Sequence, residues 1–383
     1  MDATPPAAPP RHRLLHEAAG ACGDLGTFIP HAIGAMAVAG LAPAGVLFGF
    51  GASLIGAGLF YGLPMAVQPM KAVSAVLLTG QLSPGATAAA GLMLGAVMLL
   101  LGATGLIGRV ARLIPQSVAA GLQLGLGLLM GWLGLKMMLE TPWIGVPVAV
   151  LLLALPRLAP RLPAVLLVLP AAVVAGLLGG VAEVPGIAGF APGLPPLMLP
   201  QDWGAVRRAL EFAVLPQLPL TLTNAVIVTA ILCREMFPAQ AARATERNLA
   251  LTTGIGNLLL APFGAMPMCH GAGGVIAQHR FGARGGLAPA LLGAVLLILG
   301  LGFAESAAGI FAAIPGAAVG ALLLVAGTDL ALSRRLFDAR PHCWPAIGIA
   351  AAGTALLNPA IGLAAGWAVE AARGAIGRRR TQA

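Results

Sequence analysis

The 383-residue sequence carries little charge. Asp, Glu, Lys and Arg make up 9% of it, whereas hydrophobic residues make up 58%. Soluble domains carry about 25% charged residues. Apolar runs follow one another from Ala21 to Arg373 and leave no room for a second, soluble domain. The scarcity of charge therefore excludes a soluble globular protein and predicts a chain that lies in the lipid bilayer.

Cysteine, tyrosine and recognisable catalytic motifs are also scarce. The four cysteines (Cys22, Cys233, Cys269 and Cys343) show no CxxC or metal-ligand spacing, which favours free thiols over disulfides or a zinc site. The basic residues form no patch interleaved with aromatics, so the net charge of +9 does not indicate nucleic-acid binding. Because the sequence has no nucleotide-binding motif, cofactor loop or nucleophile–base pair, we expect no enzyme, no cofactor and no ATP-driven step.

The apolar runs predict fourteen spans, seven in each half of an all-α polytopic membrane protein. Residues 1–19 are expected to form a cytoplasmic N-terminal segment without a cleaved signal peptide, 20–180 the first repeat, 181–209 an external linker, 210–375 the second repeat and 376–383 a cytoplasmic tail. The predicted spans are 20–40, 44–62, 70–80, 85–108, 114–137, 142–157, 163–180, 210–233, 247–263, 273–281, 286–302, 306–328, 342–357 and 359–375.

The basic residues predict the orientation of these spans. With both termini in the cytoplasm, 18 of the 22 Lys and Arg residues fall on the inner side, as the positive-inside rule requires. Only Lys136, Arg207 and Arg208 fall outside, and Lys71 lies within the membrane. The pattern indicates a multi-pass protein of the cell membrane, which in bacteria is the inner membrane.

Two weak internal matches indicate a duplication. Residues 51–65 align with 254–268 at an offset of 203, and Ile114-Pro115 aligns with Ile314-Pro315 at an offset of 200. Seven spans is an odd number, so the second copy must cross the membrane in the opposite direction. The halves are therefore predicted to form an inverted repeat, an arrangement associated with alternating access.

The shortest apolar segment of each half follows a Pro-Met pair, at Pro64 and at Pro267. Prolines and glycines favour extended or irregular backbone over 64–69 and 267–273, with a half-helix starting near Met70 and near Gly274. Irregular backbone at mid-membrane depth is tolerated where it lines a cavity, and half-helix N-termini there favour an anion. The alternative interpretation is a pair of ordinary proline and glycine kinks in packed helices.

Four blocks of the sequence resemble the molybdate transporter family, a branch of the sulfate permease superfamily. These are GDLGTFIP from Gly23, PMAVQPMK from Pro64, LPQLPLTLTNAVI from Leu215 and PMCHGAGGVIAQHRFGAR from Pro267. The resemblance extends over essentially the whole chain. It implies a fold of seven plus seven helices with core and gate domains, and uptake of an oxyanion that is either molybdate or sulfate.

Around the first break, four polar residues and one backbone position are candidates for the site. Asp24 either orients the site or carries a coupling proton, or else it is a structural cap at the cytoplasmic interface. Thr27 is a candidate hydrogen-bond donor. Gln68, Lys71 and the backbone of Ala72 flank the break, and Lys71 either neutralises an anion or pairs with a carboxylate such as Asp24.

The second break lacks a lysine but is richer in glycine. Here His270 either donates to an anion and changes charge with pH, or is a satisfied histidine bonded to backbone carbonyls. Gly271, Gly273 and Gly274 would let the backbone approach a ligand closely. We therefore expect one break to supply charge and the other close backbone contact. From the eighth span, Thr223 and Asn224 are expected to offer neutral hydrogen bonds to the same cavity.

These features predict a secondary active transporter that imports molybdate, or sulfate, together with protons. Importing a dianion against a negative interior requires compensating charge, which favours symport. Two alternatives remain open: a nucleobase permease of the same fold, although 215–232 contains no acidic residue, and an anion channel or membrane sensor. The expected partners are the oxyanion, protons and the lipid bilayer, and the sequence leaves open whether the chain forms a homodimer.

Overall fold

A computed structural model of the chain describes residues 10–160 and 162–382. The first half contains a broken first span, a short strand followed by a half-helix, and six further helices. Its elements are α1 (Pro10–Ala21), the 3-10 turn η1 (Cys22–Asp24), α2 (Leu25–Ala37), α3 (Pro43–Tyr61), β1 (Val67–Pro69), α4 (Lys71–Leu78), α5 (Pro84–Thr104), α6 (Ile107–Leu113), α7 (Gln116–Glu140), α8 (Pro142–Leu158) and α9 (Ala164–Leu178).

The second half repeats this order after an irregular segment. It consists of α10 (Trp203–Arg208), η2 (Ala209–Val214), α11 (Leu215–Leu220), η3 (Thr221–Val228), α12 (Thr229–Met236), η4 (Ala241–Arg243), α13 (Glu246–Leu260), η5 (Ala261–Phe263), β2 (Met268–His270), α14 (Ala272–Arg280), α15 (Leu287–Gly302), α16 (Ala304–Ala312), α17 (Gly316–Ala331), α18 (Arg334–Phe337), η6 (Pro341–Cys343), α19 (Trp344–Leu356) and α20 (Pro359–Gln382).

Five helical segments of the described chain are long and apolar enough to cross a bilayer unaided. They are α3, α5, α7, the continuous helix Trp203–Met236, and Gly316–Phe337. The helices α15 and α16 form a sixth candidate, bent by 99°. The remaining predicted spans are shorter or broken, which is tolerated in lipid where neighbouring helices satisfy the freed backbone groups. The chain is therefore a multi-pass membrane protein with a high proportion of interrupted helices.

The helices pair across the two halves in a symmetric way. Helix α3 packs on α15, α5 packs on α13, and α7 packs on α17. If the spans of each half are numbered from one to seven, the second span of either half packs on the fourth span of the other half. The two fifth spans pack on each other. This reciprocal pairing confirms the predicted inverted repeat of seven plus seven spans.

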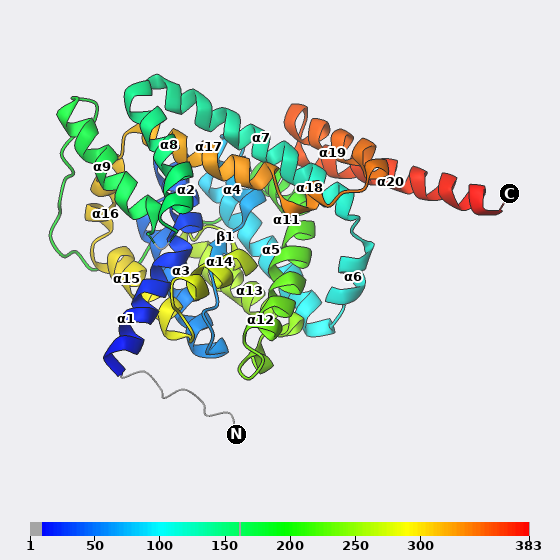
Figure 1. Cartoon of the computed structure of the whole chain (residues 1–383), viewed down its shortest axis with the longest axis horizontal. Coiled ribbons are helices and arrows are strands. Elements are labelled where there is room, and N and C mark those ends of the chain that lie inside the picture. The colour runs from blue at the N-terminus through cyan, green and yellow to red at the C-terminus, as the bar shows by residue number, and fades with distance from the viewer. Residues whose placement is uncertain (1–9, 161, 383) are drawn as a thin grey trace.

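The packing separates two groups of helices. We call α1–α5 and α10–α15 the core bundle, and α7–α9, α17, α19 and α20 the gate bundle. In Figure 1 the labels of the gate helices lie along the upper side, and those of α1, α3, α12, α13 and α15 lie below. Contacts of α4 with α7, α2 with α17, and α11 with α20 join the bundles. The first break therefore lies next to the gate.

The two breaks lie side by side as an antiparallel strand pair. Val67 pairs with His270, Gln68 with Cys269, and Pro69 with Met268. Positive-φ glycines flank both breaks at corresponding places: Gly62 (65°) and Gly264 (76°) precede the strands, and Gly80 (75°) and Gly282 (116°) follow the half-helices. Glycine adopts this left-handed backbone without a Cβ penalty. The extended segments and half-helices predicted from the sequence are thus present in both halves.

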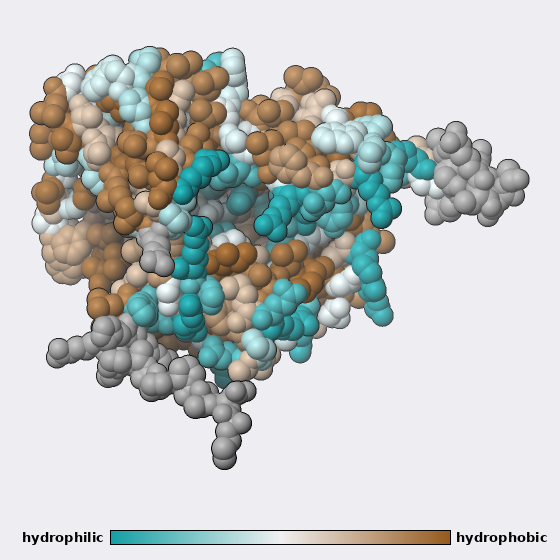
Figure 2. All heavy atoms as spheres, viewed as in Figure 1, coloured by the Kyte–Doolittle hydropathy of each residue, from teal (hydrophilic) through white to brown (hydrophobic). Residues whose placement is uncertain are grey.

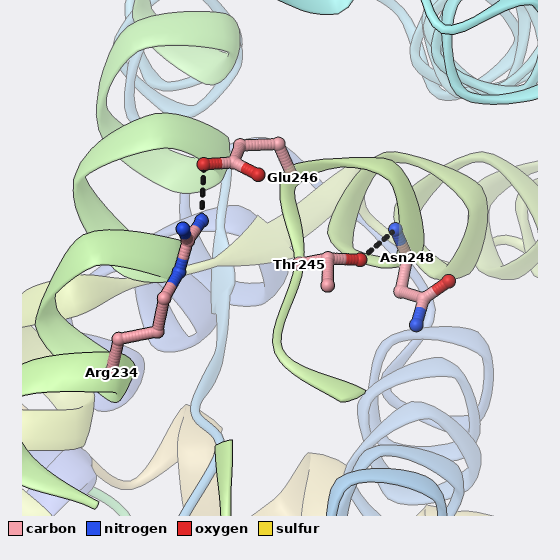
Figure 3. A network of polar contacts seen from close by, with 4 residues as sticks. All are labelled: Arg234, Thr245, Glu246 and Asn248. Carbon is pink, nitrogen blue, oxygen red and sulfur yellow. Dashed lines mark hydrogen bonds and ion pairs between the residues drawn. The ribbon is translucent and has the colours of Figure 1, made fainter. Parts of the chain in front are cut away.

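The eighth span is one helix of 34 residues, Trp203–Met236, with two π-helical stretches, η2 and η3. π-Helical segments recur at functional sites because they widen the helix and shift its side chains. The following loop is fixed at its ends by an ion pair between Arg234 and Glu246 and by the Thr245 side chain, which accepts from the Asn248 amide at 3.2 Å (Figure 3). This cap starts α13, the helix that precedes the second break.

A buried carboxylate fixes the first helix to the core bundle. Glu17 is 2% exposed, and its oxygens accept from the backbone amides of Arg284 and Gly285 at 2.9 Å each and of Ala288 at 3.1 Å. A carboxylate at a helix N-terminus satisfies otherwise unpaired N–H groups and stabilises the helix dipole. Helix α1 begins at Pro10, within the segment 1–19 that the sequence predicts to be a cytoplasmic segment, and Glu17 anchors it to the core bundle.

Candidate functional site

A cavity of about 280 Å³ lies where the two breaks, the eighth span and α7 meet. We call it the central cavity. Its polar lining consists of Thr27, Gln68, Lys71, Gln123, Gln217, Asn224 and His270, together with the backbone of 271–273. Its apolar lining consists of Pro69, Leu220, Ala225, Val228 and Cys269. The lining residues lie on the two breaks and on the helices that pack against them. The cavity therefore forms because both halves are interrupted.

The first half-helix, α4, has its N-terminus capped by a side chain. The Gln217 Oε1 atom accepts from the amide of Ala72 at 2.9 Å and from that of Val73 at 3.4 Å. The Gln217 amide nitrogen in turn donates to Thr221 Oγ1 at 2.9 Å. This corrects the expectation that the Ala72 amide is open to a ligand, because that donor is already used. At this break Gln217 and Lys71 face the cavity instead.

The second half-helix, α14, keeps free donors at its N-terminus. The amides of Gly274 and Val275 donate to the Gly271 carbonyl at 3.1 and 3.2 Å. The amides of Ala272 and Gly273, which line the cavity, make no hydrogen bond to another described residue. A helix N-terminus with unpaired amides favours an anion. The two breaks are therefore unequal: one presents side chains and the other presents backbone donors.

Asp24 is held against the second half-helix rather than against Lys71. It is 1% exposed, and its Oδ1 accepts from Gln68 Nε2 at 2.5 Å. A Cβ atom at Gly274 would lie 2.5 Å from Asp24 Oδ1 and 2.7 Å from Gln68 Nε2. Only glycine at 274 therefore lets α14 pack on this pair. Asp24 lies behind Gln68, outside the lining of the cavity.

Lys71 lines both the central cavity and a neighbouring cavity of about 540 Å³, which we call the vestibule. The vestibule is also lined by Arg157, Arg280 and Asp329. Among the described residues Lys71 forms no ion pair, so the predicted pairing with Asp24 is absent. The ammonium group at this junction makes the potential in both spaces more positive.

His270 is fixed by hydrogen bonds on both ring nitrogens. Its Nδ1 lies 3.2 Å from the Ala66 carbonyl oxygen, and its Nε2 lies 2.8 Å from Thr252 Oγ1, which is also 2.7 Å from the Tyr61 hydroxyl. Because only an N–H can pair with a carbonyl oxygen, Nδ1 carries the proton. The ring has no free nitrogen for an anion, which agrees with the alternative of a satisfied histidine that holds β2 in place.

The remaining predicted residues line three different spaces. Thr27 lines the central cavity and the vestibule. Asn224 lines the central cavity, and its Oδ1 accepts from Arg335 Nη2 at 2.6 Å. Thr223 donates its hydroxyl to the Pro219 carbonyl at 2.6 Å and lines a third cavity on the other side of Asn224. Thr223 is thus absent from the lining of the central cavity.

Three functional positions escaped sequence reasoning. Gln217 caps α4, Gln123 brings the gate bundle into the cavity, and Asn257 fixes β2. The Asn257 side chain donates to the Met268 carbonyl at 2.6 Å and accepts from the Met268 amide at 3.0 Å, which replaces a missing neighbouring strand. Gln217 could have been noticed, because a buried amide between Pro216 and Pro219 is unusual in lipid.

Hydrophilic residues are gathered on one part of the mainly apolar surface. Figure 2 shows hydrophilic residues gathered along the middle of one face, around a hollow and between two hydrophobic areas. Within the described residues there is no group of three or more His, Cys, Asp or Glu side chains arranged to hold a metal ion. The lining of the central cavity offers the Lys71 ammonium group, side-chain amides and backbone N–H groups, which suit an anion.

The inverted repeat and its paired half-helices define a membrane transport fold found in solved structures. The transmembrane domain of the cyanobacterial bicarbonate transporter BicA superimposes with a TM-score of 0.71 at 18% identity, covering 92% of this chain and 97% of that one. The murine anion transporter Slc26a9, in its inward-facing state, gives a TM-score of 0.70 at 14% identity, covering 98% and 70%. These likenesses show the sulfate-permease-type fold.

Sequence comparison gives the family. A profile described as "Molybdate transporter of MFS superfamily" matches residues 16–130 and 210–330. Molybdate transporter 2 of Arabidopsis thaliana is 30% identical, covering 93% of this chain and 86% of that protein, and Molybdate transporter 1 of the same plant is 31% identical, covering 84% and 80%. The chain belongs to the molybdate transporter family. Its architecture differs from the two parallel halves of the major facilitator superfamily, because its halves are antiparallel.

Proposed function

We propose that this protein imports a tetrahedral oxyanion, molybdate or sulfate, across the cell membrane by alternating access of the central cavity. The observation that carries the proposal is the asymmetric pair of breaks: Lys71 on one side, and the free amides of Ala272 and Gly273 on the other. An oxyanion accepts hydrogen bonds on several sides, and these donors converge on one small space from opposite directions. The gate bundle contributes Gln123 and moves relative to the core bundle.

The division into repeats and the orientation belong to the same proposal. Residues 20–180 and 210–375 form the two repeats, 181–209 the external linker, and 376–383 a tail outside the described side chains. Both termini lie in the cytoplasm, and in a bacterial cell the protein lies in the inner membrane. The arginines on α6 and α18 support this orientation, since cytoplasmic ends of spans are rich in Lys and Arg.

Uptake of labelled molybdate into vesicles that contain the purified protein tests the proposal. Wild-type protein is expected to give saturable uptake that sulfate competes for and uracil does not. Lys71→Ala removes the ammonium group from the cavity and should raise the half-saturating concentration at least about tenfold, the effect of losing one charge-assisted hydrogen bond. The matched control is Lys136→Ala, because Lys136 is exposed and stacks on Trp132 at 5.4 Å.

Three outcomes would contradict the proposal. Wild-type kinetics in Lys71→Ala would remove this residue from the site. Displacement of molybdate by uracil would favour a nucleobase permease of the same fold. Single-channel currents in planar bilayers, with no saturation of the flux, would establish an anion channel.

The pair of Asp24 and Gln68 gives a physical route to proton symport. When Asp24 is charged, it holds the amide N–H of Gln68, and the amide oxygen of Gln68 lies against Gly271 at the cavity wall. When Asp24 is protonated, its O–H donates to the Gln68 oxygen after the amide turns over, so that the NH₂ group faces the cavity. Protonation thereby converts an acceptor at the cavity wall into a donor for the oxyanion. In this scheme His270, the other proton-coupling candidate, keeps β2 in place.

Asp24→Asn tests this coupling. Wild-type uptake is expected to rise as the external pH falls from about 8 to about 5, because protonated Asp24 favours anion binding and each cycle carries protons inward. The asparagine side chain cannot exchange a proton, so uptake by Asp24→Asn should be independent of both external pH and the imposed pH gradient. The measurement is the initial rate in vesicles of fixed internal pH. A variant that keeps the wild-type pH profile would place the coupling proton elsewhere.

A further inference from the structure

The third cavity has a basic lining that the central cavity lacks. It encloses about 720 Å³ between the core bundle and the gate bundle and is lined by Arg112, Arg334, Arg335, Ser333, Gln116, Gln123, Thr223 and Asn224, with four apolar residues. We call it the arginine pocket. No Asp or Glu is among its lining residues. Three guanidinium groups without a neighbouring carboxylate make this space strongly positive; Arg112 and Arg334 are exposed to solvent, whereas Arg335 is partly buried.

Several polar atoms of the arginine pocket lack partners. Arg335 uses Nη2 to donate to Asn224, whereas its Nη1 is shielded from solvent and has no acceptor among the described residues. The Ser333 hydroxyl and the Gln123 Oε1 atom are likewise buried and unpartnered. A buried donor without an acceptor costs free energy unless a ligand or water satisfies it. The guanidinium group and the hydroxyl are donors suited to an oxyanion.

The arginine pocket adjoins the central cavity. Gln123, Asn224 and Val228 line both spaces and form the wall between them. Of these, Gln123 belongs to the gate bundle, and Asn224 belongs to the eighth span of the core bundle. Because Arg335 holds Asn224 from the far side, an anion that leaves the central cavity through this wall meets a guanidinium group next.

We propose that the arginine pocket is a second oxyanion site, which receives the transported anion after it passes the wall of Gln123 and Asn224. This inference rests on the proposed transport of an oxyanion. Arginine presents several N–H donors in a planar fork that matches the oxygen atoms of a tetrahedral anion. The wild-type protein therefore binds two oxyanions, one in each space, and the second site lies on the face that we assign to the cytoplasm.

Equilibrium binding of labelled molybdate, with purified protein in nanodiscs of uncharged phosphatidylcholine, tests the second site. We expect two bound anions per wild-type chain and one per chain of Arg334→Gln/Arg335→Gln. Arg335→Lys keeps a charge but loses the fork and should weaken the second site at least about tenfold. Arg340→Gln is the matched control, because Arg340 is exposed on the same loop region and does not line the pocket. Elution as a single species in size-exclusion chromatography checks that each variant is folded.

The outcomes separate this inference from the proposed function. If wild-type protein binds one molybdate, and the double variant binds it equally well, the second site is wrong and the transport proposal stands. If wild-type protein binds none, the transport proposal itself fails. Loss of the second binding event on adding phosphatidylglycerol would assign the pocket to a lipid headgroup. Displacement by inorganic phosphate but not by sulfate would assign it to phosphate, and either result would overturn the inference.

Discussion

Gly274→Ala is expected to impair oxyanion uptake strongly. The added methyl group would lie 2.5 Å from Asp24 Oδ1 and 2.7 Å from Gln68 Nε2, distances that neither side chain can tolerate without moving. Overpacking of a filled interior typically costs about 1–3 kcal/mol, and here the cost falls on the hydrogen bond that links the coupling carboxylate to the cavity. We expect uptake in vesicles to fall by at least about tenfold.

Two other glycines provide controls for this substitution. Gly348→Ala, in α19, places its methyl group in open space and should leave uptake unchanged. Gly273→Ala also meets no protein atom, but Gly273 lines the central cavity, so its methyl group is expected to weaken anion binding while the fold is retained. Wild-type uptake in Gly274→Ala would show that the Asp24–Gln68 contact is dispensable.

Gln217→Glu is expected to keep the fold and remove anion binding. A glutamate side chain retains an oxygen for the amides of Ala72 and Val73, and a negative charge at a helix N-terminus is favourable. The same charge faces the central cavity. At roughly 5 Å and an effective dielectric constant of about 20, repulsion amounts to about 3 kcal/mol per unit charge on the anion. Molybdate affinity should fall by more than about a hundredfold.

Gln217→Leu is expected to destabilise the fold and serves as the comparison for Gln217→Glu. Leucine removes the acceptor and leaves two buried amides of α4 unsatisfied, each at a cost of about 1–3 kcal/mol. Thermal unfolding in detergent should therefore shift to lower temperature in Gln217→Leu and remain near the wild-type value in Gln217→Glu. If both variants bind molybdate with wild-type affinity, Gln217 lies outside the site. If Gln217→Glu unfolds as readily as Gln217→Leu, the capping role is wrong.

The sequence predicts the architecture because lipid restricts the solutions. Apolar length, paired proline-rich breaks and an odd number of spans per half lead to an inverted repeat, and the strand pair of Val67–Pro69 and Met268–His270 lies within the segments predicted to be extended. The ends of those elements that depend on tertiary contacts are less predictable. Helix α1 extends from Pro10, and Glu17 anchors it to 284–288, a contact that no local pattern indicates.

The chemistry of the site is only partly predictable from the sequence, because it too depends on tertiary contacts. Gln68 and Lys71 lie at the break itself, so their place in the cavity follows from the sequence. The cap on α4 does not, because Gln217 and Ala72 are separated by 145 residues and meet only after both halves have packed. Helix dipole reasoning predicts two equivalent anion-binding ends. Gln217, distant in sequence, occupies the amides of Ala72 and Val73 at one of these ends. The amides of Ala272 and Gly273 at the other end stay open.

The reciprocal pairing of α3 with α15 and of α5 with α13 has a consequence for biosynthesis. Helices α3, α5 and α7 have their main packing partners in the other half, so they leave the ribosome before the helices that cover them exist. The early spans are inserted first and expose their glycine-lined faces to lipid. The strand β1 cannot pair until Met268 of β2 has been inserted. Long-range closure of this kind slows folding. Each half therefore requires the other to fold, and separately expressed halves should reassemble only when both are present.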